Sequence, residues 1–306
     1  MSTQCPICLN HNVAYTINHK EFPDAKIYFC PDCEHWFASP EPETKWLDSY
    51  YKEVYSIARR KFFGDEYYSI MTKRADAQSK FIKRHIGLNE KSGAAFKDKK
   101  VLDLGCGIGA LVRSFQDQQA IAIGFDSDPV AIDTGRKLWN SNIYLNSASD
   151  QNLSESYNIL CMSHVVEHFS DIRSALQGIF KSVKPGGYVF VEVPFTCDGM
   201  LHEDFDTESH LHFFSKKSLA TLLKQQGLQV IVCITCGPPI SYGKNAKSII
   251  ARPINERIVT RVSGYLSRLI EGKTTTIYDG WYDKYYLNNE TNGIWLRCLA
   301  RKKSEG

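Results

Sequence analysis

Four cysteines near the N-terminus have the type and spacing of a metal site. They form two CxxC pairs, made by Cys5, Cys8, Cys30 and Cys33. Two such pairs can supply four thiolates to one tetrahedral Zn²⁺ ion. Between the pairs, Val13–Ile17 and Lys26–Phe29 have the pattern of short strands, which are too few to fold on hydrophobic burial alone. The spacing therefore predicts a structural zinc ribbon over residues 1–40. Free or redox-active thiols are the alternative.

A glycine-rich turn follows the apolar segment Val101–Leu104. Gly105, Gly107 and Gly109 alternate with other residues, and a helical pattern begins at Ala110. Glycines let a backbone approach a ligand closely, and a helix start presents unpaired N–H groups. The pattern indicates the strand, turn and helix of a doubly wound α/β sheet that binds a nucleotide. A nicotinamide cofactor and S-adenosylmethionine are both candidates for it.

Of two aspartates near this turn, Asp103 favours S-adenosylmethionine and Asp126 fits either cofactor. Asp103 stands directly before the turn, where its carboxylate can accept hydrogen bonds from an ammonium group but would repel a pyrophosphate. S-adenosylmethionine carries such an ammonium group. The next predicted strand, Ala120–Phe125, is followed by Asp126, which is placed to accept both hydroxyls of a ribose.

Two segments further along the chain complete a family pattern. Val165-Val166-Glu167-His168 follows the predicted strand Tyr157–Ser163, and Lys184-Pro185-Gly186-Gly187 precedes the predicted strand Tyr188–Val193. Together with the glycine turn, these segments resemble class I S-adenosylmethionine-dependent methyltransferases over about residues 100–232. The resemblance implies an α/β fold with a Rossmann-like seven-stranded sheet whose last strand is antiparallel, here with a small zinc ribbon at the N-terminus.

The resemblance also implies which residues bind the methyl donor. The predicted donor-binding residues are Asp103, Gly105, Cys106, Gly107, Gly109, Asp126, Ser127, Ala148, Ser149 and Ser163. The first five would surround the methionine moiety, the next two the ribose and adenosine, and Ala148 and Ser149 the adenine ring.

The acceptor side is predicted from a histidine-rich segment. His210 opens a His-Leu-His-Phe-Phe-Ser sequence that is similar to an element of this group and of sugar C-methyltransferases that also begin with a two-CxxC zinc domain. In those relatives a glutamate precedes the histidine, whereas here Ser209 takes that position and Glu208 comes one residue earlier. A histidine with a pKa near neutrality suits removal of a proton from the acceptor. The candidate catalytic residues are His210, His168 and His164.

The polar loop at residues 194–208 and the segment after it contain acidic residues and histidines that could in principle form a metal site, namely His202, Glu203, Asp204, Asp206, His210 and His212. We expect these side chains to be solvated, and we predict no second metal.

Composition limits the class of protein. With 306 residues and 43% hydrophobic content, the chain can bury one α/β core and carry a small appendage. Its 37 basic and 34 acidic residues do not give the one-signed charge of a nucleic-acid-coating protein. No apolar run reaches the roughly 20 residues that span a bilayer, and no signal peptide is evident. We therefore expect a cytoplasmic protein.

Two further segments surround the catalytic core. Residues 41–96 have helical spacing and many tyrosines, which fits either an amphipathic layer or a lid. Residues 238–292 form an insertion before the last predicted strand, with a capping helix, a dimer helix and a membrane-surface contact as alternatives. The predicted organisation is a ribbon at 1–40, a helical region at 41–96 and a methyltransferase domain at 97–306.

The leading functional prediction is methylation of a small polar acceptor, such as a nucleotide-linked sugar, a glycan component or a secondary-metabolite intermediate. An RNA methyltransferase that uses the ribbon for recognition is the second hypothesis. Acidic residues offset the few lysines of the ribbon, so nucleic acid is not favoured as a partner. A zinc-dependent interaction scaffold with a vestigial cofactor fold is the third.

Overall fold

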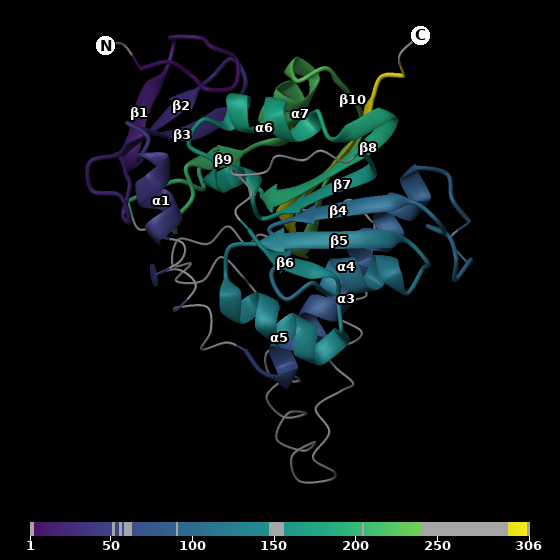
Figure 1. Cartoon of the computed structure of the whole chain (residues 1–306). Helices are drawn as coiled ribbons and strands as arrows, with labels where there is room; N and C mark the ends of the chain where they lie inside the picture. The colour runs from purple at the N-terminus through teal and green to yellow at the C-terminus, as the bar shows by residue number, and fades with distance from the viewer. Residues whose placement is uncertain are drawn as a thin grey trace.

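A seven-stranded sheet forms the centre of the computed structural model, which describes residues 3–50, 53–54, 57, 63–89, 91–146, 156–203, 205–239 and 293–304. Its strands are β4 (Lys100–Leu104), β5 (Ile121–Asp126), β6 (Ile143–Leu145), β7 (Tyr157–Ser163), β8 (Val183–Pro194), β10 (Leu228–Pro239) and β11 (Gly293–Lys302). The strand order is β10-β11-β8-β7-β4-β5-β6 (Figure 1). The five strands from β8 to β6 pair in parallel, and β11 is antiparallel to both of its neighbours. This confirms the predicted fold class, including the antiparallel last strand.

The Lys-Pro-Gly-Gly segment differs from its predicted form. Instead of a turn before the strand, it is an irregularity inside β8, because Tyr157 is opposite Val183 whereas Ile159 is opposite Tyr188. The extra residues on β8 bulge out of the ladder, and Gly186 takes a positive φ of 75° there.

Helices cover both faces of the sheet. One face carries α3 (Asp65–His85), α4 (Ala110–Gln116) and α5 (Pro129–Trp139), and the other carries α6 (Ile172–Phe180) and α7 (Lys216–Gln225) (Figure 1). Successive strand residues point to opposite faces. Accordingly, Leu102 and Leu104 pack in the core under α6 and α7, while Val101 packs in the core under α3 and α4.

In its described residues, the segment before the glycine turn includes the helices α1 (Thr44–Tyr50) and α3. α3 lies against α4, where the hydroxyl oxygens of Ser79 and Ser114 are 2.9 Å apart, and its Phe81 and Ile82 are fully buried. This packing supports the amphipathic-layer interpretation for α3. Among the described residues, no helix is long and apolar enough to cross a membrane. The predicted insertion lies outside the described residues from position 240 to position 292.

A second sheet joins the N-terminal segment to the acceptor-side loop. Its strands are β1 (Ala14–Asn18), β2 (Lys26–Cys30), β3 (His35–Ser39) and β9 (His212–Phe214), in that order. The two predicted strands are present, and β3 and β9 are additional. Figure 1 shows the green β9 beside the purple N-terminal strands. Because β9 belongs to the His-Leu-His-Phe-Phe-Ser segment, the ribbon and the candidate acceptor site share one sheet.

Candidate active site

The glycine turn after β4 combines tight packing with an open side. Gly105, Gly107 and Gly109 have φ angles of 68°, 54° and 79°, a region that disfavours other residues. A Cβ atom on Gly105 would lie 2.2 Å from the Val165 Cγ2 atom, whereas a Cβ atom on Gly107 would meet no atom of the described residues within 4 Å. Gly105 is therefore needed for packing, and Gly107 leaves room for a ligand to approach the backbone.

The carboxylate of Asp126 is held in place by this turn. Its Oδ2 atom accepts a hydrogen bond from the Gly107 N–H at 2.7 Å, and its Oδ1 atom accepts one from the Asp128 N–H at 2.9 Å. A carboxylate oxygen has two lone pairs, so these hydrogen bonds do not prevent the carboxylate from also accepting from ribose hydroxyls. Ser127 is half-buried beside it, and Asp128 caps α5 by accepting from the Val130 N–H.

Asp103 lies at the centre of the sheet with 3% of its surface exposed. Burial, and then the nearby charge of Asp126, raises the pKa of the Asp103 carboxyl to about 8. No hydrogen bond or ion pair joins this carboxyl to another residue in the described part of the chain. An ammonium group beside Asp103 would provide both the missing hydrogen bonds and a compensating charge, so the residues present fit the methionine end of S-adenosylmethionine.

The remaining predicted donor-site residues differ in their burial and in their hydrogen bonds. Cys106 is half-buried, and desolvation followed by the charge of Asp126 raises the pKa of its thiol well above the ordinary value, so the thiol stays neutral. The hydroxyl oxygen of Ser163 accepts hydrogen bonds from Arg74 and Gln78 of α3, at 3.2 and 2.9 Å. Ala148 and Ser149 lie outside the described residues.

The three predicted histidines meet around Glu167. This glutamate and His168 lie in the short 3-10 helix η2 (Val166–His168), which follows β7, and His210 precedes β9. One ligand atom from each of Glu167, His168 and His210 lies within 4.8 Å of the other two. The His164 Nδ1 atom is 3.3 Å from the Glu167 Oε1 atom. His164 itself has a positive φ of 57°, a backbone conformation that is strained for a histidine.

Burial controls the protonation of this cluster. Burial alone would raise the pKa of Glu167, but the surrounding imidazoles, His164 first, lower it to about 2. Burial, and then the charge of His168, lowers the pKa of His210 to about 3. His210 is therefore a neutral imidazole at neutral pH. The pKa near neutrality on which the sequence argument relied is not found, because 9% exposure leaves the imidazolium without solvation.

Two residues of the loop before β9 orient these imidazoles. The Glu208 Oε2 atom is 3.4 Å from the His210 Nε2 atom, so the glutamate reaches the histidine although it stands one position earlier than in the sugar C-methyltransferases. The Ser209 carbonyl oxygen accepts from the His168 Nδ1 atom at 3.2 Å.

A buried charge network beside the cluster was missed by sequence reasoning. Glu192 on β8 is directly opposite Arg297 on β11, and neither is exposed. The Glu192 carboxylate accepts hydrogen bonds from the Arg297 Nε atom, from the Arg74 Nε atom at 2.9 Å and from the Gln78 Nε2 atom at 2.9 Å. The available signal was a charged residue inside an apolar run of each strand, Glu192 in one and Arg297 in the other, because such charges are rarely buried unless they are paired.

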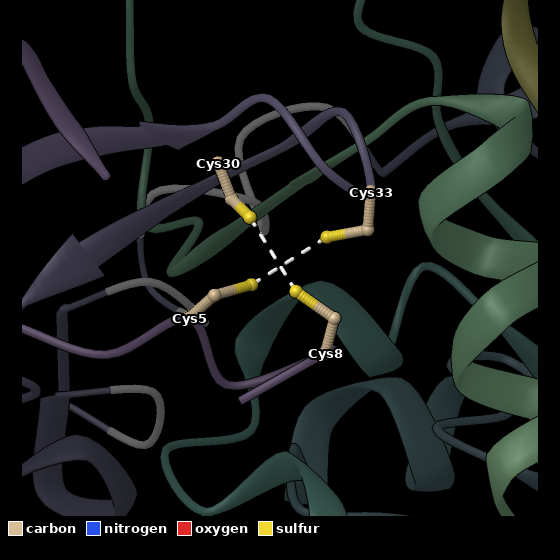
Figure 2. Close-up of side chains that lie close together, drawn as sticks. All are labelled: Cys5, Cys8, Cys30 and Cys33. Atoms are coloured by element: carbon tan, nitrogen blue, oxygen red, sulfur yellow. Dashed lines mark hydrogen bonds between the residues drawn. The ribbon is translucent and has the colours of Figure 1, made fainter. Parts of the chain in front are cut away.

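The four cysteines form a compact cluster at the edge of the second sheet. The sulfur atoms of Cys5 and Cys33 are 3.5 Å apart, those of Cys8 and Cys30 are 3.4 Å apart, and Figure 2 shows all four pointing to a common centre. Tetrahedral zinc with Zn–S bonds of about 2.3 Å separates its sulfurs by about 3.8 Å. The cluster is thus compatible with one zinc ion.

Comparison with known proteins identifies the class that this fold and site define. Residues 76–232, more than half of the chain, match the family described as "Methyltransferase domain". The chain belongs to this methyltransferase family.

Similar proteins include curated relatives and solved structures. The "Ubiquinone biosynthesis O-methyltransferase" of Aliivibrio fischeri is 38% identical over 103 residues, which are 30% of this chain and 42% of that relative. The chain therefore matches less than half of this relative's length. The structure of the Burkholderia thailandensis 1,6-didemethyltoxoflavin-N1-methyltransferase has a TM-score of 0.56, with 12% identity over 94% of this chain and all of that one. The plantazolicin methyltransferase has a TM-score of 0.50, with 14% identity over 84% of this chain and 93% of that one. At these identities the two structures support the fold alone.

Proposed function

We propose that this methyltransferase transfers a methyl group to a hydroxyl of a small polar acceptor at the cluster of Glu167, His168 and His210. One observation carries the proposal. The Val165 side chain packs directly on Gly105. The segment that carries Glu167 and His168 therefore begins in contact with the glycine turn at which the donor is proposed to bind. Ligands of open α/β sheets bind at the carboxyl ends of the strands, and both features lie there.

When bound, S-adenosylmethionine supplies an electrophilic methyl group on its sulfonium. In this proposal Asp103 accepts hydrogen bonds from the donor ammonium, and Asp126 accepts from the ribose hydroxyls. The backbone around Gly107 lies along the donor, since no side-chain atom fills the space there. Cys106, Gly109, Ser127 and Ser163 shape the rest of this pocket.

On the acceptor side, His210 is the first candidate for the group that takes the hydroxyl proton, followed by His168 and His164. A neutral imidazole can accept the proton, and the imidazolium that results lies beside the carboxylates of Glu167 and Glu208. These two charges compensate the cation that burial otherwise disfavours. Glu208 also fixes the ring orientation of His210, because its carboxylate is 3.4 Å from the Nε2 atom.

Two kinds of acceptor fit this site. A nucleotide-linked sugar follows from the likeness of the His-Leu-His-Phe-Phe-Ser segment to sugar methyltransferases. The name of the Aliivibrio relative, an O-methyltransferase of ubiquinone biosynthesis, supports an oxygen acceptor and adds a hydroxylated aromatic ring. The four cysteines bind a structural zinc ion in this proposal, which holds the ribbon against the acceptor side.

The test supplies the zinc-loaded protein with S-adenosylmethionine carrying a labelled methyl group, together with a nucleotide-linked deoxysugar, 3,4-dihydroxybenzoate or bulk RNA. We expect label on an oxygen of one of the two small acceptors. Replacing His210→Ala should lower that turnover by about 100-fold, the usual worth of general-base catalysis. Transfer to RNA alone would contradict the acceptor proposal. A protein that binds donor and methylates none of the three would contradict it too.

A further inference from the structure

The side chains of the acceptor-side cluster form a metal-binding set. Glu167, His168 and His210 supply one carboxylate and two imidazoles, and their ligand atoms lie within 4.8 Å of one another. Imidazole and carboxylate groups together suit divalent first-row transition ions. Ligands of one such ion at about 2.1 Å are about 3.0–3.4 Å apart when adjacent, so side-chain shifts of roughly an ångström close the set.

The environment of the Glu167 carboxylate is the strongest evidence that this cluster binds a cation. Its side chain is fully buried, and neither carboxylate oxygen has a hydrogen-bond partner among the described residues. The 3.3 Å contact from His164 is an ion pair only when His164 is protonated. A buried carboxylate without hydrogen bonds is costly, and a cation between it and the two imidazoles would remove that cost.

Hydrogen bonds to neighbouring groups hold the His168 ring and the backbone of this set in place, as is usual for metal ligands. His168 donates its Nδ1 hydrogen to the Ser209 carbonyl oxygen at 3.2 Å, and a hydrogen bond of this kind fixes the ring orientation of metal-binding histidines. The Leu211 N–H donates to the Glu167 carbonyl oxygen at 2.8 Å, so the backbone ties the segment of His210 to the segment of Glu167 and His168.

We infer that Glu167, His168 and His210 bind one divalent transition-metal cation, of the Mn²⁺ or Zn²⁺ type, with open coordination positions for water and the acceptor hydroxyl. This inference rests on the proposed function, since it places the ion where the acceptor reacts. It changes the contribution of His210, which would hold the ion that fixes the acceptor oxygen.

From the sequence we expected no second metal, because only the histidines and acidic residues close to one another in the chain were considered, and these were predicted to be solvated. Two of the three ligands come instead from η2, more than forty residues earlier in the chain, and only the fold brings them to His210.

The test titrates Mn²⁺ into full-length protein whose cysteine cluster already holds zinc, and follows the loss of the free Mn²⁺ signal by electron paramagnetic resonance. Thiolate sites bind Mn²⁺ poorly, so the cysteines do not compete. We expect one bound Mn²⁺ per chain, and binding about 100-fold weaker or undetectable in Glu167→Gln and His168→Ala. His202→Ala removes an exposed histidine of the same loop and should bind as the unchanged protein does.

Calorimetry with S-adenosylhomocysteine on the same samples shows that each variant is folded. An unchanged protein that binds this nucleoside but no Mn²⁺, and no Zn²⁺ beyond the ion of the cysteines, overturns the inference. Unaltered Mn²⁺ affinity in Glu167→Gln overturns it as well. Methyl transfer by such a metal-free cluster would leave the proposed function standing, whereas Mn²⁺ binding without transfer to any small acceptor would support the site and contradict that function.

Discussion

His19 of the ribbon donates a hydrogen bond from its Nε2 atom to the carbonyl oxygen of His210, across 2.8 Å. Its Nδ1 atom accepts from the N–H groups of Glu21 and Phe22, so the ring has its hydrogen on Nε2. The neighbouring Ala38 N–H donates to the Leu211 carbonyl oxygen at 2.8 Å. The ribbon thus holds the backbone on which the candidate acceptor site depends.

Replacing His19→Ala should separate acceptor alignment from donor binding. The variant leaves the His210 carbonyl without its buried donor, which costs about 1–3 kcal/mol and lets the loop shift. Because small displacements of a reacting group are costly, turnover should fall by about 10-fold to 100-fold. Affinity for S-adenosylhomocysteine should stay within about twofold. The exposed His11 serves as control, since His11→Ala should retain full turnover, and equal turnover in both variants would remove His19 from this role.

Loss of the cysteine cluster should act through β9. Cys30→Ser removes one of the four proposed zinc ligands. If the cluster binds zinc as proposed, residues 1–40 should lose the metal and unfold, because metal binding would provide their folding free energy. β9 then loses β3, its neighbour in the sheet. We expect protease cleavage within residues 1–40 and strongly reduced turnover, with donor affinity within about threefold of normal. Cys197→Ser, outside the cluster, should change none of these, and a Cys30→Ser protein with normal turnover would disprove the coupling.

The two glycines of the donor turn should respond differently to alanine. Gly105→Ala places a Cβ atom 2.2 Å from the Val165 side chain, so thermal stability should drop markedly. Gly107→Ala meets no atom of the described residues within 4 Å and should cost only about 1–2 kcal/mol for its positive φ. It should nevertheless weaken S-adenosylhomocysteine binding by at least about tenfold, because the methyl group occupies the space of the donor. Normal donor affinity in Gly107→Ala would argue against a donor at this position.

The buried pair of Glu192 and Arg297 should contribute strongly to stability. Arg297→Met leaves the Glu192 carboxylate with Arg74 as its remaining cation, and removing one partner of a buried pair costs about 3–5 kcal/mol. Urea denaturation measures this loss. The triple variant Arg74→Met, Glu192→Gln, Arg297→Met removes all three charges of the network, and it should be less destabilised than Arg297→Met alone because no charge then lacks its partner.

The same pair predicts an acid response. Burial would raise the pKa of Glu192, but Arg297 and Arg74 hold it well below its usual range. The stability that this group provides is therefore complete above the unfolded pKa of about 4.5 and is lost as the pH falls below it. Glu192→Gln should show a smaller loss of stability between pH 5 and pH 3, by the same urea measurement.

The fold was predictable because each strand of the core carries its own local signal. The apolar run before Gly105 and the apolar runs of the later strands indicate the sheet, and its antiparallel end followed from the family resemblance. β9 was not predictable, because three residues carry no periodicity and its partner strand lies more than 170 residues away. The histidines were identified as candidates, but the pKa of His210 depends on burial, which only tertiary packing creates. The pairing of Glu192 with Arg297 likewise depends on strand register, which neither segment specifies alone.

Calorimetric titration with S-adenosylhomocysteine at several pH values tests the donor site most directly. Asp103 must be ionised to accept hydrogen bonds from the ammonium group of the ligand. Because the pKa of its carboxyl is about 8, binding at lower pH releases the proton of this carboxyl. We predict one site per chain, an affinity that rises by up to about tenfold per pH unit towards pH 8, and weak, pH-independent binding in Asp103→Asn. Folded protein that gives no binding heat, or Asp103→Asn that binds as tightly as the unchanged chain, would contradict the account.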